Sequence, residues 1–321
     1  MTRLLITGGA GFIGGRVAAL ALEAGHAVTV LDDLSTGRVE RLEALEAKGG
    51  HAVRGDLRDP EARAQALEGV EAVVHLAAQV SVARSVEDPQ ETASINIHAT
   101  EGLANDMEAR GIRRLVLASS AAVYGDAADL PLGEDAAGKR LSPYADSKWA
   151  NEAEVLRRRA AGWEALALRF FNVYGTGQRA DGAYAAVIPA FVDRMCGGTS
   201  PRILGTGKQT RDFVHVDDVA GLLLHLTTAP WRPTPRHAYN VATGRRVSLL
   251  DLVHTLAGAL RARGVDGAHL NPEFGPPRPG DITDSLACVD AIREELGWQA
   301  TVSLEDGLAR MVDERLTNAS R

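Results

Sequence analysis

The chain has 321 residues, of which 45 % are hydrophobic and 24 % are charged, and these proportions exclude fibrous and disordered classes of protein. Its net charge of −7 argues against nucleic-acid binding, because a phosphate backbone requires an excess of lysine and arginine. No run approaches the roughly 18 apolar residues of a membrane span, so we expect a cytoplasmic protein with no membrane partner.

Short aliphatic runs alternate with longer amphipathic stretches through the first 170 residues. In chain order the runs are RLLIT, HAVTVLD, HAVRGD, EAVVHLAA, RRLVLASS and EALALRF. Apolar runs of strand length, separated by segments of helix length, are typical of a parallel sheet that is covered by helices on both faces. The sequence therefore predicts an α/β fold with a doubly wound parallel sheet.

Segments rich in glycine and proline begin after about residue 172. GTGQRADGAY, CGGTSPRILGTGKQTRD and PEFGPPRPGDITD are typical of loops around a substrate. Between them we predict a helix at 217–228, a strand at HAYNVA and a helix at 248–263 that returns to the main sheet. The predicted domains are a nucleotide-binding domain, 1–172 plus about 216–263, and a smaller, discontinuous C-terminal substrate lobe, about 173–215 and 264–321.

The stretch TGGAGFIG, residues 7–14, follows the first predicted strand directly and opens a helix. Gly8, Gly11 and Gly14 have the spacing GxxGxxG, which permits a tight turn, a close approach of a diphosphate and close packing of helix on strand. An acidic pair, Asp32 and Asp33, ends the second predicted strand. Together these features predict dinucleotide binding by a Rossmann fold.

Acidic residues distinguish between the possible dinucleotides. Asp32 should accept hydrogen bonds from the adenosine ribose, and its charge would repel a 2′-phosphate, so NAD is favoured over NADP. Asp56 follows the third strand, where it would either reach the adenine amino group or cap a helix. The predicted cofactor-binding residues are Gly8, Gly11, Phe12, Ile13, Gly14, Asp32, Asp33, Asp56, Leu57, Leu76, Ala77, Ala78, Tyr144 and Lys148.

The stretch SPYADSK, residues 142–148, places Tyr144 and Lys148 four positions apart. On a helix they would share one face and could act on one substrate, although an isolated pair of this kind is more often a solvated helix face. With the glycine loop, SSAAVYG at 119–125 and YADSK at 144–148, the chain resembles the extended short-chain dehydrogenase/reductases, and within them the nucleotide-sugar 4-epimerases. NVYG, GTGKQTRDFVHVDD and RPGDI extend the resemblance along the chain.

The resemblance implies catalytic roles for three residues. Tyr144 would be the acid/base, Lys148 its partner and Ser120 the hydroxyl that hydrogen-bonds the reacting oxygen. It also implies oxidation of the sugar at C4 by NAD⁺, rotation of a 4-keto sugar and return of the hydride to the opposite face. We expect the Lys148 ammonium and the positive nicotinamide to lower the pKa of the Tyr144 phenol from its ordinary value of about 10.

Two sister reactions of this family start with the same oxidation. Dehydratases of the family usually carry an Asp–Glu pair just after the active-site serine or threonine, and uronate decarboxylases commonly carry a Glu there. This chain has Ala121 and Ala122, whose methyl groups transfer no proton, so epimerisation is favoured.

The resemblance also suggests the residues that bind a UDP-sugar. Arg211, Arg278 and Asp281 match positions that hold the nucleotide diphosphate and ribose, because an arginine fork suits phosphate oxygens. Asn172 matches a position near the sugar and diphosphate. The predicted substrate-binding residues are Ser120, Asn172, Arg179, Val187, Arg211, Arg278, Asp281 and Ser285.

Two of these residues bear on which sugar is bound. Ser285 aligns with a bulky aromatic of some galactose-type epimerases, so a decorated hexose should fit, and GAYAAVIP at 182–189 resembles the N-acetylhexosamine epimerases. Arg179, in QRAD, resembles the arginine of UDP-glucuronate 4-epimerases and would bind a C5 carboxylate at two points. We favour a uronate slightly over an N-acetylhexosamine or a plain hexose.

The remaining candidate residues predict no other chemistry. His75 and His215 lie in strand-like segments where a packed histidine is expected, and no cluster has metal spacing. Cys196 and Cys288 are expected to be reduced. The resemblance implies a homodimer formed by the helices at about 90–109 and 144–160. A dehydrogenase that releases NADH, and an inactive NAD-binding regulator, are the alternatives to an epimerase.

Overall fold

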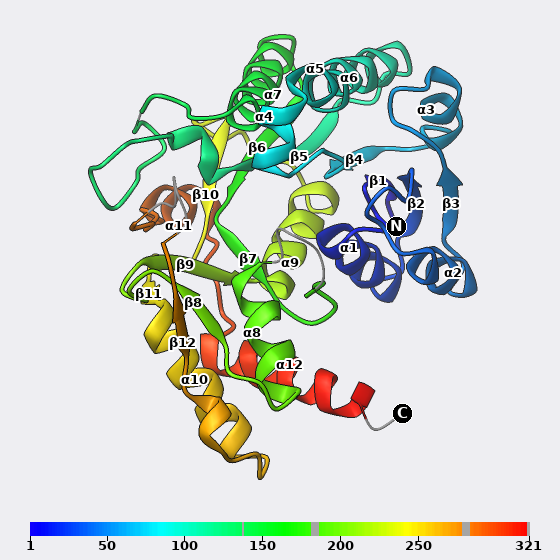
Figure 1. Ribbon diagram of the computed structural model, residues 1–321. Helices are drawn as coiled ribbons and strands as arrows, with labels where there is room; N and C mark the ends of the chain where they lie inside the picture. The colour runs from blue at the N-terminus through cyan, green and yellow to red at the C-terminus, as the bar shows by residue number, and fades with distance from the viewer. Residues whose placement is uncertain (137, 181–185, 278–282, 320–321) are drawn as a thin grey trace.

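The computed structural model describes residues 1–136, 138–180, 186–277 and 283–319 of the chain. Its main feature is a seven-stranded parallel sheet with the strand order β10-β6-β5-β4-β1-β2-β3 (Figure 1). The strands are β1 (Arg3–Thr7), β2 (Ala27–Asp32), β3 (His51–Arg54), β4 (Ala72–His75), β5 (Arg114–Ser120), β6 (Glu164–Phe170) and β10 (Ala238–Val241). The predicted α/β fold is confirmed.

Both faces of this sheet are buried, which explains why its strands appear as continuous apolar runs. Leu4 and Ile6 of β1 belong to one core cluster and Leu5, between them, belongs to another. The first cluster includes side chains of α1 (Phe12–Glu23), α2 (Val39–Ala47) and α9 (Val216–Thr228). The second includes side chains of α3 (Pro60–Ala66), α6 (Ala99–Ala109) and α7 (Pro143–Ala160).

The sheet reverses its strand order between β1 and β4, which are paired neighbours (Figure 1). Crossovers leave the sheet in opposite directions at such a point, so a crevice opens at the carboxyl ends of these two strands. The loops after β1, β4 and β5 all start at this edge. The fold therefore brings the glycine loop, 76–78 and Ser120 together.

Several segments after residue 171, but not α9 and β10, form a second cluster of structure (Figure 1). Two small sheets, β11-β9-β7 and β12-β8, pack with three helices. The elements are β7 (Asn172–Tyr174), α8 (Val187–Cys196), β8 (Arg202–Leu204), β9 (Thr210–His215), β11 (Arg246–Ser248), α10 (Leu249–Arg261), β12 (Glu273–Gly275) and α12 (Leu304–Ala319). Helix α11 (Asp290–Leu296) lies beside β10.

One predicted helix packs elsewhere than we expected. We placed 248–263 on the main sheet, but α10 packs against α8 and α12, and its residues Leu252, Leu256 and Leu260 are buried in their shared core. The amphipathic pattern predicts a helix but not the surface that it covers. We therefore propose that residues 249–261 belong to the substrate lobe, while α9 and β10 stay with the sheet.

The helical stretch expected at about 90–109 is divided in three. It consists of α5 (Pro89–Ala93), a π-helical segment (Ser94–His98) and α6, and it follows the short α4 (Val82–Glu87). Within the described ranges, no helix has the length and apolarity needed to cross a membrane.

Candidate active site

The glycine loop forms the predicted cradle between β1 and α1. Gly8 has φ +70°, and a Cβ there would lie 2.8 Å from the Ala77 nitrogen, so only glycine lets the loop approach the 76–78 segment. A Cβ at Gly14 would lie 2.3 Å from the Gly8 oxygen. Gly11 is the N-cap of α1, and no side chain caps the helix. Its first N–H groups are therefore available to a diphosphate, and the loop fits a dinucleotide.

Asp32 lies at the end of β2, directly under this loop. Its Oδ2 accepts a hydrogen bond from the Ala10 N–H at 2.9 Å, and its Oδ1 accepts one from the Leu34 N–H at 2.8 Å. Burial raises the pKa of Asp32 above its ordinary value, and the two backbone hydrogen bonds offset part of that rise. Each oxygen keeps a second lone pair, which suits a bidentate contact with ribose hydroxyls.

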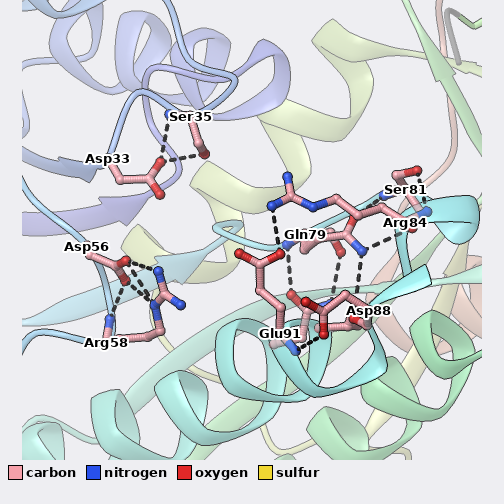
Figure 2. Close-up of polar contacts among 11 residues, drawn as sticks. Asp33, Ser35, Asp56, Arg58, Gln79, Ser81, Arg84, Asp88 and Glu91 are labelled. Carbon is pink, nitrogen blue, oxygen red and sulfur yellow. Dashed lines mark hydrogen bonds and ion pairs between the residues drawn. The ribbon is translucent and has the colours of Figure 1, made fainter. Parts of the chain in front are cut away.

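Asp33 and Asp56 lie in the segments that directly follow β2 and β3, and Figure 2 shows their polar contacts. Asp33 accepts from the Ser35 N–H at 2.9 Å. Asp56 accepts hydrogen bonds from the side chain and backbone of Arg58, and this lowers its pKa. The N-cap of α3 is Asp59 rather than Asp56, so the helix-cap alternative for Asp56 is wrong. Leu57 beside it is buried.

Ser120, Tyr144 and Lys148 converge where β5 meets the start of α7. Ser142 caps α7 by accepting the Ala145 N–H at 3.2 Å, and Pro143 supplies the preset φ of the first helical residue. The Ser120 hydroxyl lies near enough to the Tyr144 phenol to lower its pKa. Lys148 Nζ lies 5.9 Å from the centre of the Tyr144 ring and donates to the Ala118 oxygen at 2.9 Å.

Burial dominates the titration of these groups. Burial raises the pKa of Tyr144, and the Ser120 hydroxyl offsets only part of that rise. Burial lowers the pKa of Lys148 to about 8. Our expectation of a lowered Tyr144 pKa is therefore wrong for the protein alone, because the phenol is desolvated.

The two alanines after Ser120 form part of a 3-10 turn, Ala121–Tyr124. The Ala122 N–H donates to the Ser120 Oγ at 3.2 Å, which fixes the turn beside the reacting position. Only methyl side chains are present at these two places.

The region that carries Asn172, Arg211 and Ser285 is organised around Asp212 of β9. Its buried carboxylate accepts from the Thr243 N–H at 2.9 Å, the Gly244 N–H at 3.0 Å and the Ala287 N–H at 3.3 Å. Asn172 Nδ2 donates to the Asp212 carbonyl at 3.2 Å. Asp212 thus joins its own strand to the segments that carry Asn172 and Ser285, and sequence reasoning missed it.

Two other predicted substrate residues, Arg211 and Ser285, lie next to this centre. Arg211 Nη1 donates to the Thr210 carbonyl at 2.9 Å, and the buried Ser285 donates its N–H to the same carbonyl at 3.1 Å. Val187 begins α8 and is half-buried. Arg278, Asp281 and the part 182–185 of GAYAAVIP lie outside the described residues.

Arg179 is exposed and lies two residues after Gly177, whose carbonyl accepts a hydrogen bond from Arg41 of α2. Burial lowers the pKa of Arg41, and the charge of Arg179 lowers it further. The histidines are packed, as expected: His75 hydrogen-bonds Thr7 and Thr100, and His215 accepts the Asp217 N–H at 3.2 Å.

A second network that sequence reasoning missed supports α7. Glu152 lies four residues beyond Lys148 and pairs with Arg169 of β6 at 2.7 Å, with both side chains buried. It also accepts the Ser119 hydroxyl at 2.5 Å. The extension of the 144–148 spacing to 152 was the available signal. No group of three or more potential metal ligands occurs among the described residues.

A model of the "NAD dependent epimerase/dehydratase family" matches residues 4–242. The match covers most of the chain and includes the glycine loop, Ser120, Tyr144 and Lys148. The chain therefore belongs to the NAD-dependent epimerase/dehydratase family, as the resemblance predicted.

Relatives and solved structures narrow the comparison to nucleotide-sugar enzymes. The UDP-glucose 4-epimerase of Mycolicibacterium smegmatis is 37 % identical, with 97 % of each chain covered. A UDP-N-acetylglucosamine 4-epimerase from Methanobrevibacter ruminantium, in complex with UDP-N-acetylmuramic acid, is 29 % identical, with 99 % of each chain covered and a TM-score of 0.90. MoeE5, in complex with UDP-glucuronic acid and NAD, is 32 % identical, with 99 % of this chain and 100 % of that chain covered and a TM-score of 0.82.

Proposed function

We propose that the protein is an NAD-dependent UDP-sugar 4-epimerase. The observation that carries this proposal is the convergence of Ser120, Tyr144 and Lys148 beside the glycine loop, with Ala121 and Ala122 in the places where sister enzymes carry acids. The family supports a nicotinamide cofactor, and the relatives' names support a 4-epimerase.

The residues of this chain divide the acid/base work. NAD, when bound, accepts hydride from C4 of the sugar and returns it. Tyr144 would take the proton of the 4-hydroxyl and give it back, and Ser120 would hold that oxygen in reach of the phenol. Because burial keeps the phenol protonated, Tyr144 depends on Ser120 and the Lys148 ammonium to favour its phenolate.

The glycine loop and its acidic neighbours would hold the cofactor. The α1 N-terminus at Gly11 suits the diphosphate, and Asp32 suits the adenosine ribose. Phe12, Ile13, Leu76, Ala77 and Ala78 line the same edge of the sheet. On the other side, Asn172, Arg211 and Ser285 would contact the UDP-sugar.

We infer that UDP-glucuronate, converted to UDP-galacturonate, is the leading substrate. Arg179 offers a guanidinium for the C5 carboxylate, the small Ser285 leaves room for it, and the similarity to MoeE5 with bound UDP-glucuronic acid supports this choice. UDP-glucose is the second candidate, favoured by the name of the 37 % identical relative, and UDP-N-acetylglucosamine is the third.

We also propose a homodimer. Apolar side chains that are 43–63 % exposed cluster on α4, α7 and the turn before α4, and these two helices are in contact. The side chains are Val80, Val82, Val86, Trp149 and Leu156. A second copy of the chain would cover this surface.

The first test uses purified protein, without added cofactor, and three separate substrates: UDP-glucuronate, UDP-N-acetylglucosamine and UDP-glucose. The C4 epimers are resolved by chromatography, and we expect UDP-glucuronate to be converted fastest. Tyr144→Phe should lower the rate about 10²- to 10⁴-fold, whereas Tyr239→Phe, on the far edge strand β10, should not.

Each alternative predicts a different result. Net absorbance at 340 nm on addition of substrate and NAD would indicate a dehydrogenase that releases NADH, and conversion unaffected by Tyr144→Phe would refute the catalytic assignment. Arg179→Asp should abolish turnover of UDP-glucuronate and spare UDP-glucose. Equal loss for both substrates would contradict the uronate assignment.

A further inference from the structure

Arg41 of α2 joins two loops that are distant in the sequence. Its Nη1 donates to the Ala10 carbonyl at 3.1 Å and its Nη2 donates to the Gly177 carbonyl at 2.7 Å. Ala10 lies in the glycine loop, and Gly177 lies in the loop that follows β7. One guanidinium therefore bridges the dinucleotide cradle and the loop that carries Arg179.

One end of this bridge continues into the proposed ribose site, and the other end continues to α12. The N–H of Ala10 donates to Asp32, the proposed ribose ligand, so one residue of the glycine loop contacts both Asp32 and Arg41. Gly177 has φ +78°, and its N–H donates to Glu314 of α12 at 2.9 Å. A Cβ at Gly177 would lie 3.1 Å from Arg41 Nη2, so the loop passes close to the guanidinium.

The position of Arg41 is fixed by packing as well as by hydrogen bonds. Its Cδ lies over Gly15 of α1, where a Cβ would be only 2.9 Å away. The side chain is half-buried, which strengthens charge-assisted hydrogen bonds to the two carbonyls. A lysine has a single nitrogen and does not offer the same fork.

We propose that Arg41 is a positioning residue that couples dinucleotide binding to UDP-sugar binding. The inference rests on the proposed function, in which the two bridged loops border the two ligands. A dinucleotide that orders the glycine loop would also order the 175–180 loop through Arg41, and a bound UDP group would stabilise the cradle in return. Such coupling is reciprocal between the two ligands.

A second set of ion pairs, centred on Asp217, joins α1 to α12 and can be compared with the Arg41 bridge. Asp217 of α9 accepts from Arg16 of α1 at 2.6 Å and from Arg310 of α12 at 3.0 Å. It joins helices and includes neither Ala10 nor Gly177. The Arg41 bridge is thus the one of the two that contacts both loops.

The test measures how fast bound NAD leaves the purified full-length protein, with and without saturating UDP. We expect UDP to slow release at least ~5-fold in the wild type, at the lower end of ordinary coupling. In Arg41→Met, which keeps the stem over Gly15, NAD should leave faster and UDP should slow its release less than ~2-fold. Lys48→Met removes an exposed cation at the C-terminus of the same helix and should behave as the wild type.

The possible outcomes distinguish failure of the coupling proposal from failure of the proposed function. If UDP does not raise the melting temperature of the wild type, the proposed function fails. If UDP binds but slows NAD release equally in the wild type and Arg41→Met, the coupling proposal is overturned. Arg41→Lys keeps the charge but not the fork of two nitrogens, so it should also lose the coupling. Full coupling in this variant would show that the positive charge alone couples the two ligands, and it would overturn the proposed role of the two hydrogen bonds to carbonyls.

Discussion

Burial opposes the charged forms of both residues at the reacting position. The pKa of Tyr144 is raised and that of Lys148 is lowered to about 8, so the protein alone holds a neutral phenol beside an ammonium that loses its proton easily. A desolvated pair of this kind responds strongly to any further charge placed near it, because the local dielectric is low. This sensitivity suits a site whose acid/base state should change when ligands bind.

His75 illustrates how hydrogen bonding fixes a neutral group next to this pair. The Thr100 hydroxyl donates its proton to the Asn96 carbonyl at 2.8 Å, so the His75 Nε2 must donate to Thr100. Nδ1 then accepts from Thr7 at 2.7 Å, and the neutral ring has both nitrogens satisfied. Burial, with a smaller contribution from Lys148, lowers the pKa of His75 to about 3.

Protein stability should therefore fall as the pH is lowered from about 6.5 towards 3. In that window the unfolded chain binds a proton at this histidine and the folded chain does not, which lowers the free energy of unfolding by up to about 1.4 kcal/mol per pH unit. Urea unfolding at several pH values should show a shallower slope for His75→Gln. The exposed His254→Gln is the control, and an unchanged slope in His75→Gln would contradict the assignment.

At the scale of elements, a buried ion pair ties α7, which carries the proposed catalytic Tyr144 and Lys148, to β6. Glu152 and Arg169 are 2 % and 3 % exposed at their side chains, and Arg169 also donates to the Tyr124 hydroxyl at 3.1 Å and the Glu134 carbonyl at 2.7 Å. Since Glu152 also holds Ser119, the pair sets the register of α7 against β5 and β6. It thereby fixes Tyr144 relative to Ser120.

Removing one partner of this pair should destabilise the fold by about 3–5 kcal/mol, because an uncompensated charge stays buried. Glu152→Gln and Arg169→Met should each show this loss in urea unfolding. The double variant should lose less than the sum of the two. Arg293→Met removes an exposed pair with Asp290 and should change stability by less than about 1 kcal/mol. Additive losses would refute the coupling.

Sequence reasoning reached the elements that depend on local patterns and missed those that depend on distant partners. The strands were predictable because burial on both faces makes them continuously apolar, and the glycine loop was predictable because sterics demand glycine at Gly8 and Gly14. The π-helical segment at 94–98 was not predictable, because it depends on distant partners of Asn96. The Asn96 amide donates to the Gln79 carbonyl at 2.9 Å and to Ser147 of α7 at 3.0 Å. Gln79 belongs to the polar segment seen in Figure 2.

The same difference between local patterns and distant partners explains which site residues could be predicted. Ser120, Tyr144 and Lys148 lie in short motifs, and the structure brings them together. Glu152 with Arg169, Asp212 and Arg41 act through partners that are 17 to 136 residues away, and no local pattern identifies those partners, although the 144–148 spacing extends to Glu152. Our prediction of where α10 packs was wrong for a similar reason. The apolar face of an amphipathic helix can cover any apolar surface that the topology offers.

At the scale of the whole molecule, we expect the exposed apolar surface of α4 and α7 to bury itself in a dimer. Light scattering after size exclusion should give twice the chain mass of 34.0 kDa. Leu156→Glu places a charge in this surface and should yield a monomer. Phe274→Glu, at an exposed site of the substrate lobe, should not. A monomeric wild type would refute the proposed interface.

The late position of β10 in the chain has a consequence for biosynthesis. Strand β6 is complete at residue 170, but the neighbour that covers its free edge ends at residue 241, so 71 residues are translated in between (241 − 170). At ordinary elongation rates this leaves an unpaired edge for roughly 4 to 14 s. An apolar strand edge invites pairing with another nascent chain. We therefore expect the ribosome-bound intermediate to be the stage at which this sheet is most exposed to such pairing.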